Sequence, residues 1–395
     1  MAAQQLCSAP NQEESVLLAT LDASSFHYQN SWSFTAAAGA LFEELESVFR
    51  ESRPSGTHWK ARMAELGSAA WEALPQTVRD ILHPHSNIDV LISGDSYWTA
   101  FPWEALRFGP GEDDYLGWSR PLTRWSALTA AGTSVLAATP SRGPERSVAI
   151  VCPWDADPRQ LLKGSRDEAL ALARDLPLRD FSLTTGGPIL GAGATQASIK
   201  TALSARPAFF HFTGHGGFVR EEETLLLHGG TFGSSQIRAL QQEKGWADGV
   251  FAGGALIVLN CCFTGRTRMH GGHREDLTGV FLEQGARGVI ASALPVYDPV
   301  GQVLGMAIYA VPGSTGIGAV VTTIRKMIGT LSAAAESPFY PTWSMIQYHG
   351  DPWLAMPSAP ASLVGVPMPG LIEAVASWLK ISPERAATAI AEFMH

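Results

Sequence analysis

The stretch AFFHFTGHGG (residues 208–217) and the stretch ALIVLNCCFTG (residues 255–265) decide the fold. Each is an apolar run of the strand type that ends in a turn of small residues carrying one reactive side chain. Near-continuous apolar runs are typical of strands buried on both faces, as in a parallel sheet covered by helices. Ligands bind outside the carboxyl ends of such strands. We therefore expect His215 and Cys262, which follow the two strands, to meet at one rim of the sheet.

The chain from Ser147 onward alternates between strand and helix patterns. Strands are expected at 148–152, 208–212, 255–259 and 288–293, and helices at 166–176, 195–205, 277–284 and 298–310. Such alternation predicts an α/β fold with a mostly parallel sheet sandwiched by helices.

We expect four segments along the chain, because a polar stretch at 141–146 indicates a boundary near residue 145. They are a disordered leader (1–14), an N-terminal α/β domain (15–145), the domain with His215 and Cys262 (146–352) and a C-terminal helical extension (353–395). The N-terminal domain carries helical patterns at 34–50 and 59–81. In the extension, the apolar side chains Leu371, Val375, Trp378 and Leu379 are suited to docking a partner helix.

Composition excludes several classes of function. Charged residues make up 16% of the chain and apolar residues 46%, which is typical of a compact enzyme. The net charge of -9 leaves no basic footprint for nucleic acid. No glycine-rich phosphate loop, metal-ligand spacing or other cofactor motif is present, so we expect no cofactor and no metal.

The cysteine content and the apolar runs predict the compartment. Cys7, Cys152, Cys261 and Cys262 are too few for a disulfide framework, which favours a reducing compartment. We see neither a signal peptide nor an apolar run of about 18 residues. We therefore expect a cytoplasmic protein without membrane contact.

The residue types around His215 and Cys262 point to nucleophilic catalysis. Cys262 is expected to attack a carbonyl carbon, and His215 to activate the thiol and protonate the leaving amine. The N–H groups of Gly216 and Cys262 are placed to form an oxyanion hole. Cys261 alternates to the other face and is expected to point into the core. One alternative is that His215 only caps a loop. Another is a zinc site formed by the two cysteines together with His270 and His273.

Several motifs together resemble the CHAT proteases, which are caspase-like cysteine peptidases of clan CD related to separase and common in bacteria. The matching segments are FPWEAL (101–106), FHFTGHG (210–216), LNCCFTG (259–265), DLTGVFLEQGARGVIASALPVYD (276–298) and YPTWSMIQYHGDP (340–352). The resemblance assigns the nucleophile to Cys262. The chain departs from the family pattern at two places. It has Asn260-Cys261 where the family more often has Ser-Ala, and Ala293-Leu294-Pro295 where many members have Ser-Leu-Trp.

The resemblance implies cleavage of a protein substrate after a selected residue, P1. Asp298 matches an acidic position that faces a basic P1 side chain in separase-like members, so we expect Arg or Lys there. The alternative interpretation is that Asp298 caps the helix that follows. Glu275 and Asp276 are further acidic candidates at the rim of the site.

The N-terminal domain is a candidate for a degenerate half of the same architecture. The resemblance implies activation by a partner or ligand in a bacterial defence or cell-death system. With a basic P1, self-cleavage at Arg266 or Arg268 is a weaker hypothesis. Two other functions stay open. One is a catalytically silent caspase-like scaffold that binds a partner protein, and the other is a small-molecule acyl hydrolase or transferase using the same thiol.

Overall fold

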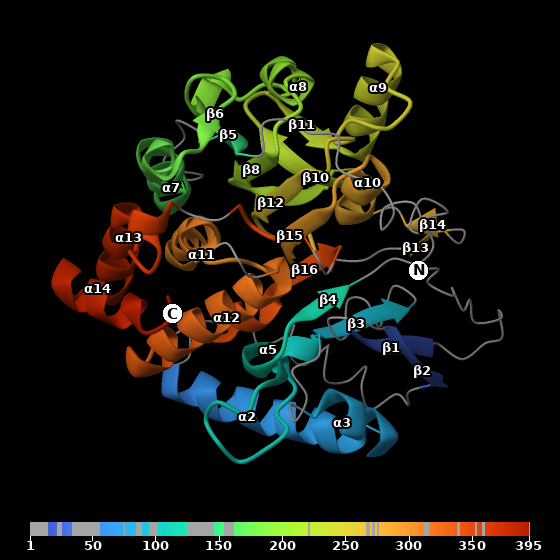
Figure 1. Cartoon of the computed structure of the whole chain (residues 1–395), viewed down its shortest axis with the longest axis vertical. Helices are drawn as coiled ribbons and strands as arrows, with labels where there is room; N and C mark the ends of the chain where they lie inside the picture. Colours follow the sequence, from blue (N-terminus) through green and yellow to red (C-terminus); the bar gives the residue numbers. More distant parts are fainter. Residues whose placement is uncertain are drawn as a thin grey trace.

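The computed structural model describes much of the chain (Figure 1). The described residues are 15–21, 26–33, 56–74, 76–83, 89–94, 102–124, 146–153, 162–219, 222–265, 269–270, 273–274, 276–311, 316–337, 340–351, 354–357 and 360–394. The expected leader at 1–14 and the expected helix at 34–50 lie outside this part of the chain.

An 11-stranded sheet runs through the described part of the molecule. Its order is β2-β1-β3-β4-β16-β15-β12-β8-β5-β6, and β7 pairs with β5. The strands are β1 (Ser15–Leu21), β2 (Phe26–Ser33), β3 (Asp89–Gly94), β4 (Leu122–Arg124), β5 (Ser147–Cys152), β6 (Ser182–Leu183), β7 (Ile189–Leu190), β8 (Phe209–Thr213), β12 (Leu256–Asn260), β15 (Gly288–Ser292) and β16 (Ile346–Gly350). All neighbours from β15 to β6 run parallel, whereas β16 is antiparallel to β15. The expected mostly parallel α/β sheet is confirmed.

Smaller strands and helices surround this sheet. A three-stranded sheet consists of β9 (Gly216–Val219), β10 (Glu222–Leu227) and β11 (Gly230–Gly233), and β13 (Met269–His270) pairs with β14 (His273–Arg274). The helices are α2 (Gly56–Ala73), α3 (Gln76–Leu82), α5 (Leu116–Ser119), α7 (Lys163–Asp175), α8 (Gln196–Ser204), α9 (Ser234–Lys244), α10 (Leu277–Glu283), α11 (Asp298–Ala310), α12 (Ile317–Ala334), α13 (Pro369–Leu379) and α14 (Pro383–Ala391).

The N-terminal strands extend the same sheet. β4 pairs in parallel with β3 on one side and with β16 on the other. The chain before residue 125 is therefore joined to the rest edge to edge, which removes two exposed sheet edges. The expected boundary near residue 145 falls within 125–145, outside the described residues.

The parallel strands are buried on both faces, which explains their continuous apolar runs. In β12, Leu256 and Val258 face a first core, under α7, α11, α12 and α13, whereas Ile257 and Leu259 face a second core, under α8, α9 and α10. Side chains alternate in the same way along β5, β8 and β15. Figure 1 shows the two groups of helices on opposite sides of these strands.

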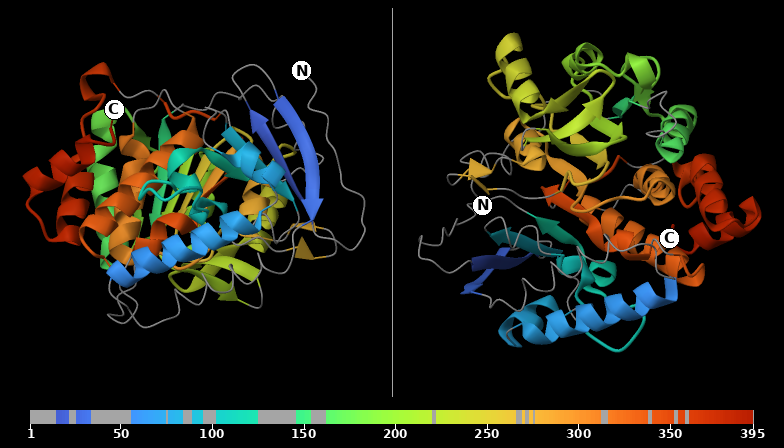
Figure 2. Two further views of the ribbon diagram at one scale, coloured as in Figure 1. Left: turned by 90° about the horizontal axis from the view of Figure 1, so that it is seen from below. Right: turned by 180° about the vertical axis from the view of Figure 1, so that it is seen from behind.

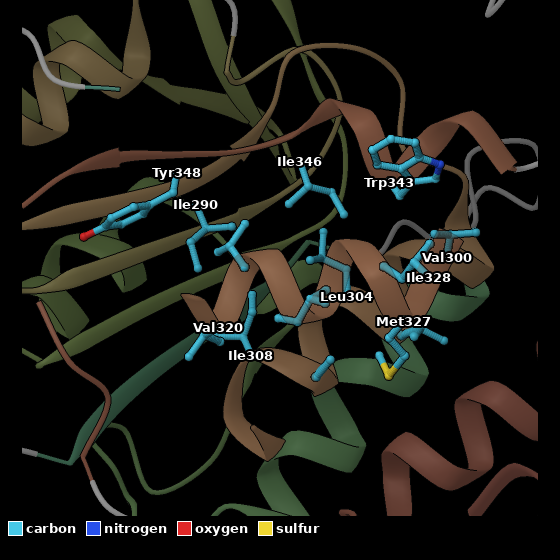
Figure 3. Close-up of a cluster of buried hydrophobic side chains, with 14 of the residues drawn as sticks. Ile290, Val300, Leu304, Ile308, Val320, Met327, Ile328, Trp343, Ile346 and Tyr348 are labelled. Atoms are coloured by element: carbon cyan, nitrogen blue, oxygen red, sulfur yellow. The ribbon is translucent and has the colours of Figure 1, made fainter. Parts of the chain in front are cut away.

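The first core is built on long aliphatic side chains. In Figure 3, Ile290 of β15 and Ile346 of β16 lie over Leu304 and Ile308 of α11 and Val320 of α12. Each is at most 3% exposed, and burying such a side chain contributes about 1.5–3 kcal/mol. The packing fixes α11 and α12 against the sheet.

The C-terminal helices lie at the end of the molecule away from β1 and β2 (Figure 2). Leu371 and Val375 of α13 are fully buried in the first core, and Trp378 and Leu379 pack partly buried against it. The expectation that this face docks a partner helix is therefore wrong, because α13 uses it against α7 and α11 of its own chain. No helix in the described part of the chain is long and apolar enough to span a membrane.

Candidate active site

The strands β8 and β12 bring the two reactive stretches together. They pair in parallel, and the last register pair is Thr213 with Asn260. Beyond it, the Gly214 N–H donates to the Asn260 carbonyl at 3.3 Å. His215 and Cys262 each follow this last pair by two residues, so the pairing brings both to the same carboxyl-end rim.

The adjacent cysteines have different surroundings. Cys261 is 2% exposed within the second core, and its Sγ lies 3.7 Å from Thr264 Oγ1. Cys262 is partly exposed, and its Sγ lies 3.9 Å from the carbonyl oxygen of Val296. Burial raises the pKa of both thiols above the ordinary value. Cys261 therefore belongs to the core, whereas part of the Cys262 side chain is exposed to solvent.

The residue after Cys262 has an unusual backbone. Phe263 adopts a φ of 62°, in the left-handed region that side chains other than Gly rarely occupy. Its ring packs near Phe218 of β9, with the centroids 6.3 Å apart. Such strain persists only where the surroundings impose it, and it gathers at functional sites.

Gly216 lets the histidine loop approach the cysteine turn. A Cβ atom at this position would lie 2.4 Å from the Cys262 carbonyl oxygen, so a larger residue would force the loops apart. The Leu226 N–H donates to the His215 carbonyl at 3.0 Å. His215 and Leu226 therefore form a hydrogen-bonded pair of the antiparallel ladder. Gly216 then lies opposite Leu225 in the next pair, and its N–H points away from β10.

Asp298 caps a helix other than its own. Its carboxylate accepts the N–H of Gly164 at 2.6 Å and that of Ser165 at 3.0 Å, at the start of α7. A negative charge there satisfies orphan N–H groups and complements the helix dipole. The N-cap of α11 itself is Tyr297, so the interpretation of Asp298 as the cap of the following helix is wrong. Its role in binding substrate stays a prediction.

Of the other two acidic candidates, only Asp276 lies among the described residues. Asp276 is fully buried, and its carboxylate accepts the Gly279 N–H at 2.7 Å as the N-cap of α10. The expectation that Asp276 lies at the rim is corrected by this burial, since a capping carboxylate without exposed surface cannot meet a substrate. Glu275 lies outside the described residues.

A buried polar network beneath the two strand ends was missed by the sequence analysis. Glu168 of α7 is fully buried and contacts His211, Thr213 and Asn260. The sequence does contain one signal for this network, because polar residues interrupt the apolar runs of the two strands. A buried polar side chain needs a hydrogen-bond partner. The sequence does not show that Glu168, more than forty residues before β8, is that partner.

Comparison with known proteins identifies the family. Residues 64–311 match the family model of the CHAT domain. The chain belongs to the CHAT family. The match covers more than half of the chain and includes both reactive stretches, so the resemblance carried by the motifs is confirmed. A comparison with curated protein sequences gives no match.

Two solved structures are similar to part of this CHAT chain at low sequence identity. The Arg-specific cysteine proteinase gingipain R (RgpB) of Porphyromonas gingivalis is 12% identical with a TM-score of 0.44, covering 62% of this chain and 57% of its own. Separase from Saccharomyces cerevisiae, in complex with securin, is 15% identical with a TM-score of 0.44, covering 66% of this chain. This chain spans only 57% and 15% of their respective lengths.

The FPWEAL segment of this CHAT chain is linked to the cysteine turn. Glu104 is fully buried and accepts two hydrogen bonds from Arg124, at 2.5 and 2.8 Å. The side-chain amide of Gln347 has one orientation in which both of its polar atoms form hydrogen bonds. In this orientation the amide oxygen accepts from Arg124 at 3.1 Å and the amide nitrogen donates to the Gly265 carbonyl at 3.2 Å. A chain of hydrogen bonds thus runs from Glu104 to a residue three positions after Cys262.

Proposed function

We propose that this chain is a cysteine endopeptidase with Cys262 as nucleophile and His215 as general base and acid. The observation that carries the proposal is the register of β8 and β12, in which each reactive residue follows the same pair, Thr213 and Asn260, by two positions. A nucleophile and a base brought together from separate segments are typical of this chemistry. Membership of the CHAT family supports the same assignment.

The proposed reaction follows from the groups at the rim. The Cys262 sulfur attacks the carbonyl carbon of the scissile peptide bond while His215 accepts the thiol proton. The N–H groups of Gly216 and Cys262 stabilise the oxyanion. His215 then passes the proton to the leaving amine as the C–N bond breaks, and water hydrolyses the thioester. Because burial raises the pKa of the Cys262 thiol, the reaction depends on His215 to form the thiolate.

We further propose that Asp298 selects a basic P1 residue. It is half-buried and lies two residues after Val296, whose carbonyl faces the Cys262 sulfur. A carboxylate has about four acceptor positions. Two N–H groups and the Ser165 hydroxyl, at 3.4 Å, use about three of them, which leaves about one for a guanidinium or ammonium group. The family resemblance alone supports the remaining proposals of an activating partner or ligand, a defence or cell-death role and a companion protein as substrate. The free thiols support a reducing, cytoplasmic location.

The test is cleavage of a P1-scanned fluorogenic peptide library by the full chain and three variants. We expect Cys262→Ala and His215→Ala each to lower kcat by at least about 10³-fold. Cys261→Ala is the matched control and should stay within about 3-fold, because that thiol lies in the core.

Two outcomes would contradict the proposal. If Cys261→Ala loses turnover and Cys262→Ala keeps it, the wrong thiol has been assigned. If the wild-type chain neither cleaves nor reacts at Cys262 with a peptide electrophile, with or without candidate partners, the chain is a scaffold that binds a partner without catalysis.

A further inference from the structure

We propose that Glu168 is a positioning residue of this site, a single buried carboxylate that holds both reactive strand ends in place. The inference rests on the proposed function, because it concerns the residues assigned to that reaction. Glu168 has no exposed surface and acts only through the residues that it contacts.

One oxygen atom ties β8 to β12. Glu168 Oε2 accepts a hydrogen bond from Thr213 Oγ1 at 2.8 Å and another from Asn260 Nδ2 at 2.7 Å. Thr213 and Asn260 are the last register pair of the two strands, and each precedes a reactive residue by two positions. A shift of Glu168 therefore changes the spacing of the two strand ends at the point where they leave the ladder.

The other oxygen anchors the carboxylate to the sheet. Glu168 Oε1 lies 2.7 Å from His211 Nε2, and His211 Nδ1 lies 3.2 Å from the Tyr309 hydroxyl. Asn260 Nδ2 also donates to the Gly301 carbonyl of α11 at 2.7 Å. Among the described residues, the titratable groups that interact with Glu168 are His211 of β8, Tyr309 of α11 and Cys261. Burial raises the pKa of Glu168, although the hydrogen bonds from its neighbours oppose this effect.

Stability alone does not account for a carboxylate at this position. Burying a carboxylate costs free energy that an apolar side chain of similar size would not, and such replacements are often neutral or stabilising. What Glu168 provides is a fixed geometry for the three polar side chains around it. A misplacement of about 1 Å at catalytic groups lowers rates by about 10²-fold.

The network identifies a conservative variant that keeps the positioning. In Glu168→Gln, the amide oxygen can replace Oε2 and accept from Thr213 and Asn260. The amide nitrogen can replace Oε1 and donate to His211 Nε2, provided that His211 carries its proton on Nδ1 and donates to Tyr309. Every group stays hydrogen-bonded in Glu168→Gln, whereas Glu168→Ala removes all three contacts.

The experiment uses the full chain and reads Cys262 directly. The rate of alkylation by iodoacetamide is followed against pH by peptide mass spectrometry at Cys262, alongside kcat and KM for the best peptide. The variants are Glu168→Gln, Glu168→Ala and His215→Ala. The matched control is Asp175→Ala, which removes a buried carboxylate from the same helix, one that accepts the Gly370 N–H at 2.7 Å.

We expect Glu168→Ala to lower kcat by about 100-fold with little change in KM. Its alkylation profile should move to higher pH, part of the way toward that of His215→Ala, because the base is held less closely to the thiol. Glu168→Gln should remain within about 3-fold of wild type, since its hydrogen bonds are preserved. Asp175→Ala should lower the melting temperature and leave the alkylation profile unchanged.

Failure of this inference can be separated from failure of the proposed function. If wild type and His215→Ala share one alkylation profile, there is no dyad and both are overturned. If those two differ but Glu168→Ala matches wild type in kcat and profile, only the role of Glu168 is overturned. If Glu168→Ala does not fold, Thr213→Val tests the positioning role instead, because it removes only the hydrogen bond from Thr213 to Glu168. A kcat unchanged in Thr213→Val would overturn the positioning role, and a loss of about 10-fold would support it.

Discussion

At the scale of single residues, strand alternation carries much of the information. Consecutive side chains of a strand point to opposite faces, so Cys261 and Cys262 were expected to differ. The structure confirms that Cys261 lies in the core, at 2% exposure. The pairing of His215 with Cys262 in catalysis stays a prediction, although β8 and β12 bring them to the same rim.

Side chains whose roles depend on tertiary contacts were harder to predict. Asp276 and Asp298 both resemble acids of a binding cleft in the sequence, yet each caps a helix. The partners of Asp298 are Gly164 and Ser165, over 130 residues away, and no local pattern indicates them. Glu168 was missed for the same reason.

Asp298→Asn tests substrate selection through the P1 preference rather than through stability. The amide oxygen can replace only one of the two oxygens that cap α7, and the NH2 group would face the other N–H, so we expect the melting temperature to fall as well. If the carboxylate also binds a basic P1 side chain, kcat/KM for P1 Arg should fall at least about 10-fold relative to P1 Leu. The measurement is the P1 profile of both proteins, with Asp298→Ala as a control that loses the cap. An unchanged P1 profile in Asp298→Asn would leave this carboxylate with the capping role alone.

At the scale of elements, long periodic segments were predicted well and short ones poorly. The helix expected at 195–205 is α8, with Thr195 as its N-cap. The charged stretch at 217–223 carries no strand pattern in the sequence, yet its described residues lie in two strands. Gly216–Val219 forms β9, and Glu223 is 3% exposed with its carboxylate accepting the Leu277 N–H. Glycine and charge lower strand propensity, and tertiary pairing with β10 overrides that preference.

The spacing between α7 and α11 depends on a glycine of α11. A Cβ atom at Gly305 would lie 1.7 Å from Glu168 Oε1. Gly305→Ala should therefore lower stability by about 1–3 kcal/mol, although Ala favours a helix by about 1 kcal/mol. It should also lower kcat, because it displaces Glu168 without touching the reactive residues.

Urea unfolding and peptide cleavage would check both effects of Gly305→Ala. Gly318→Ala in α12 is the matched control, since its nearest neighbour would be a Pro121 carbon at 3.2 Å. A Gly305→Ala protein as stable and as active as wild type would mean that Glu168 can move without consequence.

At the scale of the whole molecule, the sequence predicted the α/β class but not the continuity of the sheet. The polar stretch at 141–146 suggested separate domains, whereas β4 joins the N-terminal strands to β16. Strand β4 has only three residues and carries little signal of its own. The polar centre of this junction is Glu104, which contacts Arg124 of β4 and Arg325 of α12.

Among the described residues, this buried cluster contains one carboxylate that faces two guanidinium groups, all without exposed surface. Burial lowers the pKa of Arg325 to about 10, and Glu104 opposes this effect. Glu104→Gln removes the carboxylate that faces both buried cations and should lower the free energy of unfolding by about 3–5 kcal/mol. Arg325→Met leaves a neutral pair of Glu104 and Arg124 and should cost less, about 1–3 kcal/mol from the unpaired Ile346 carbonyl.

The sign of the coupling between Glu104 and Arg325 is the decisive measurement. Arg325→Met removes one of the two cations that lose this carboxylate in Glu104→Gln. The double variant should therefore be more stable than Glu104→Gln alone. Urea unfolding, followed by the fluorescence of the buried Trp103 and Trp343, gives all three free energies. If the losses of stability in the two single variants simply add, Glu104 does not offset the charge of Arg325. In that case the junction between the N-terminal strands and the rest of the sheet depends on packing rather than on this ion cluster.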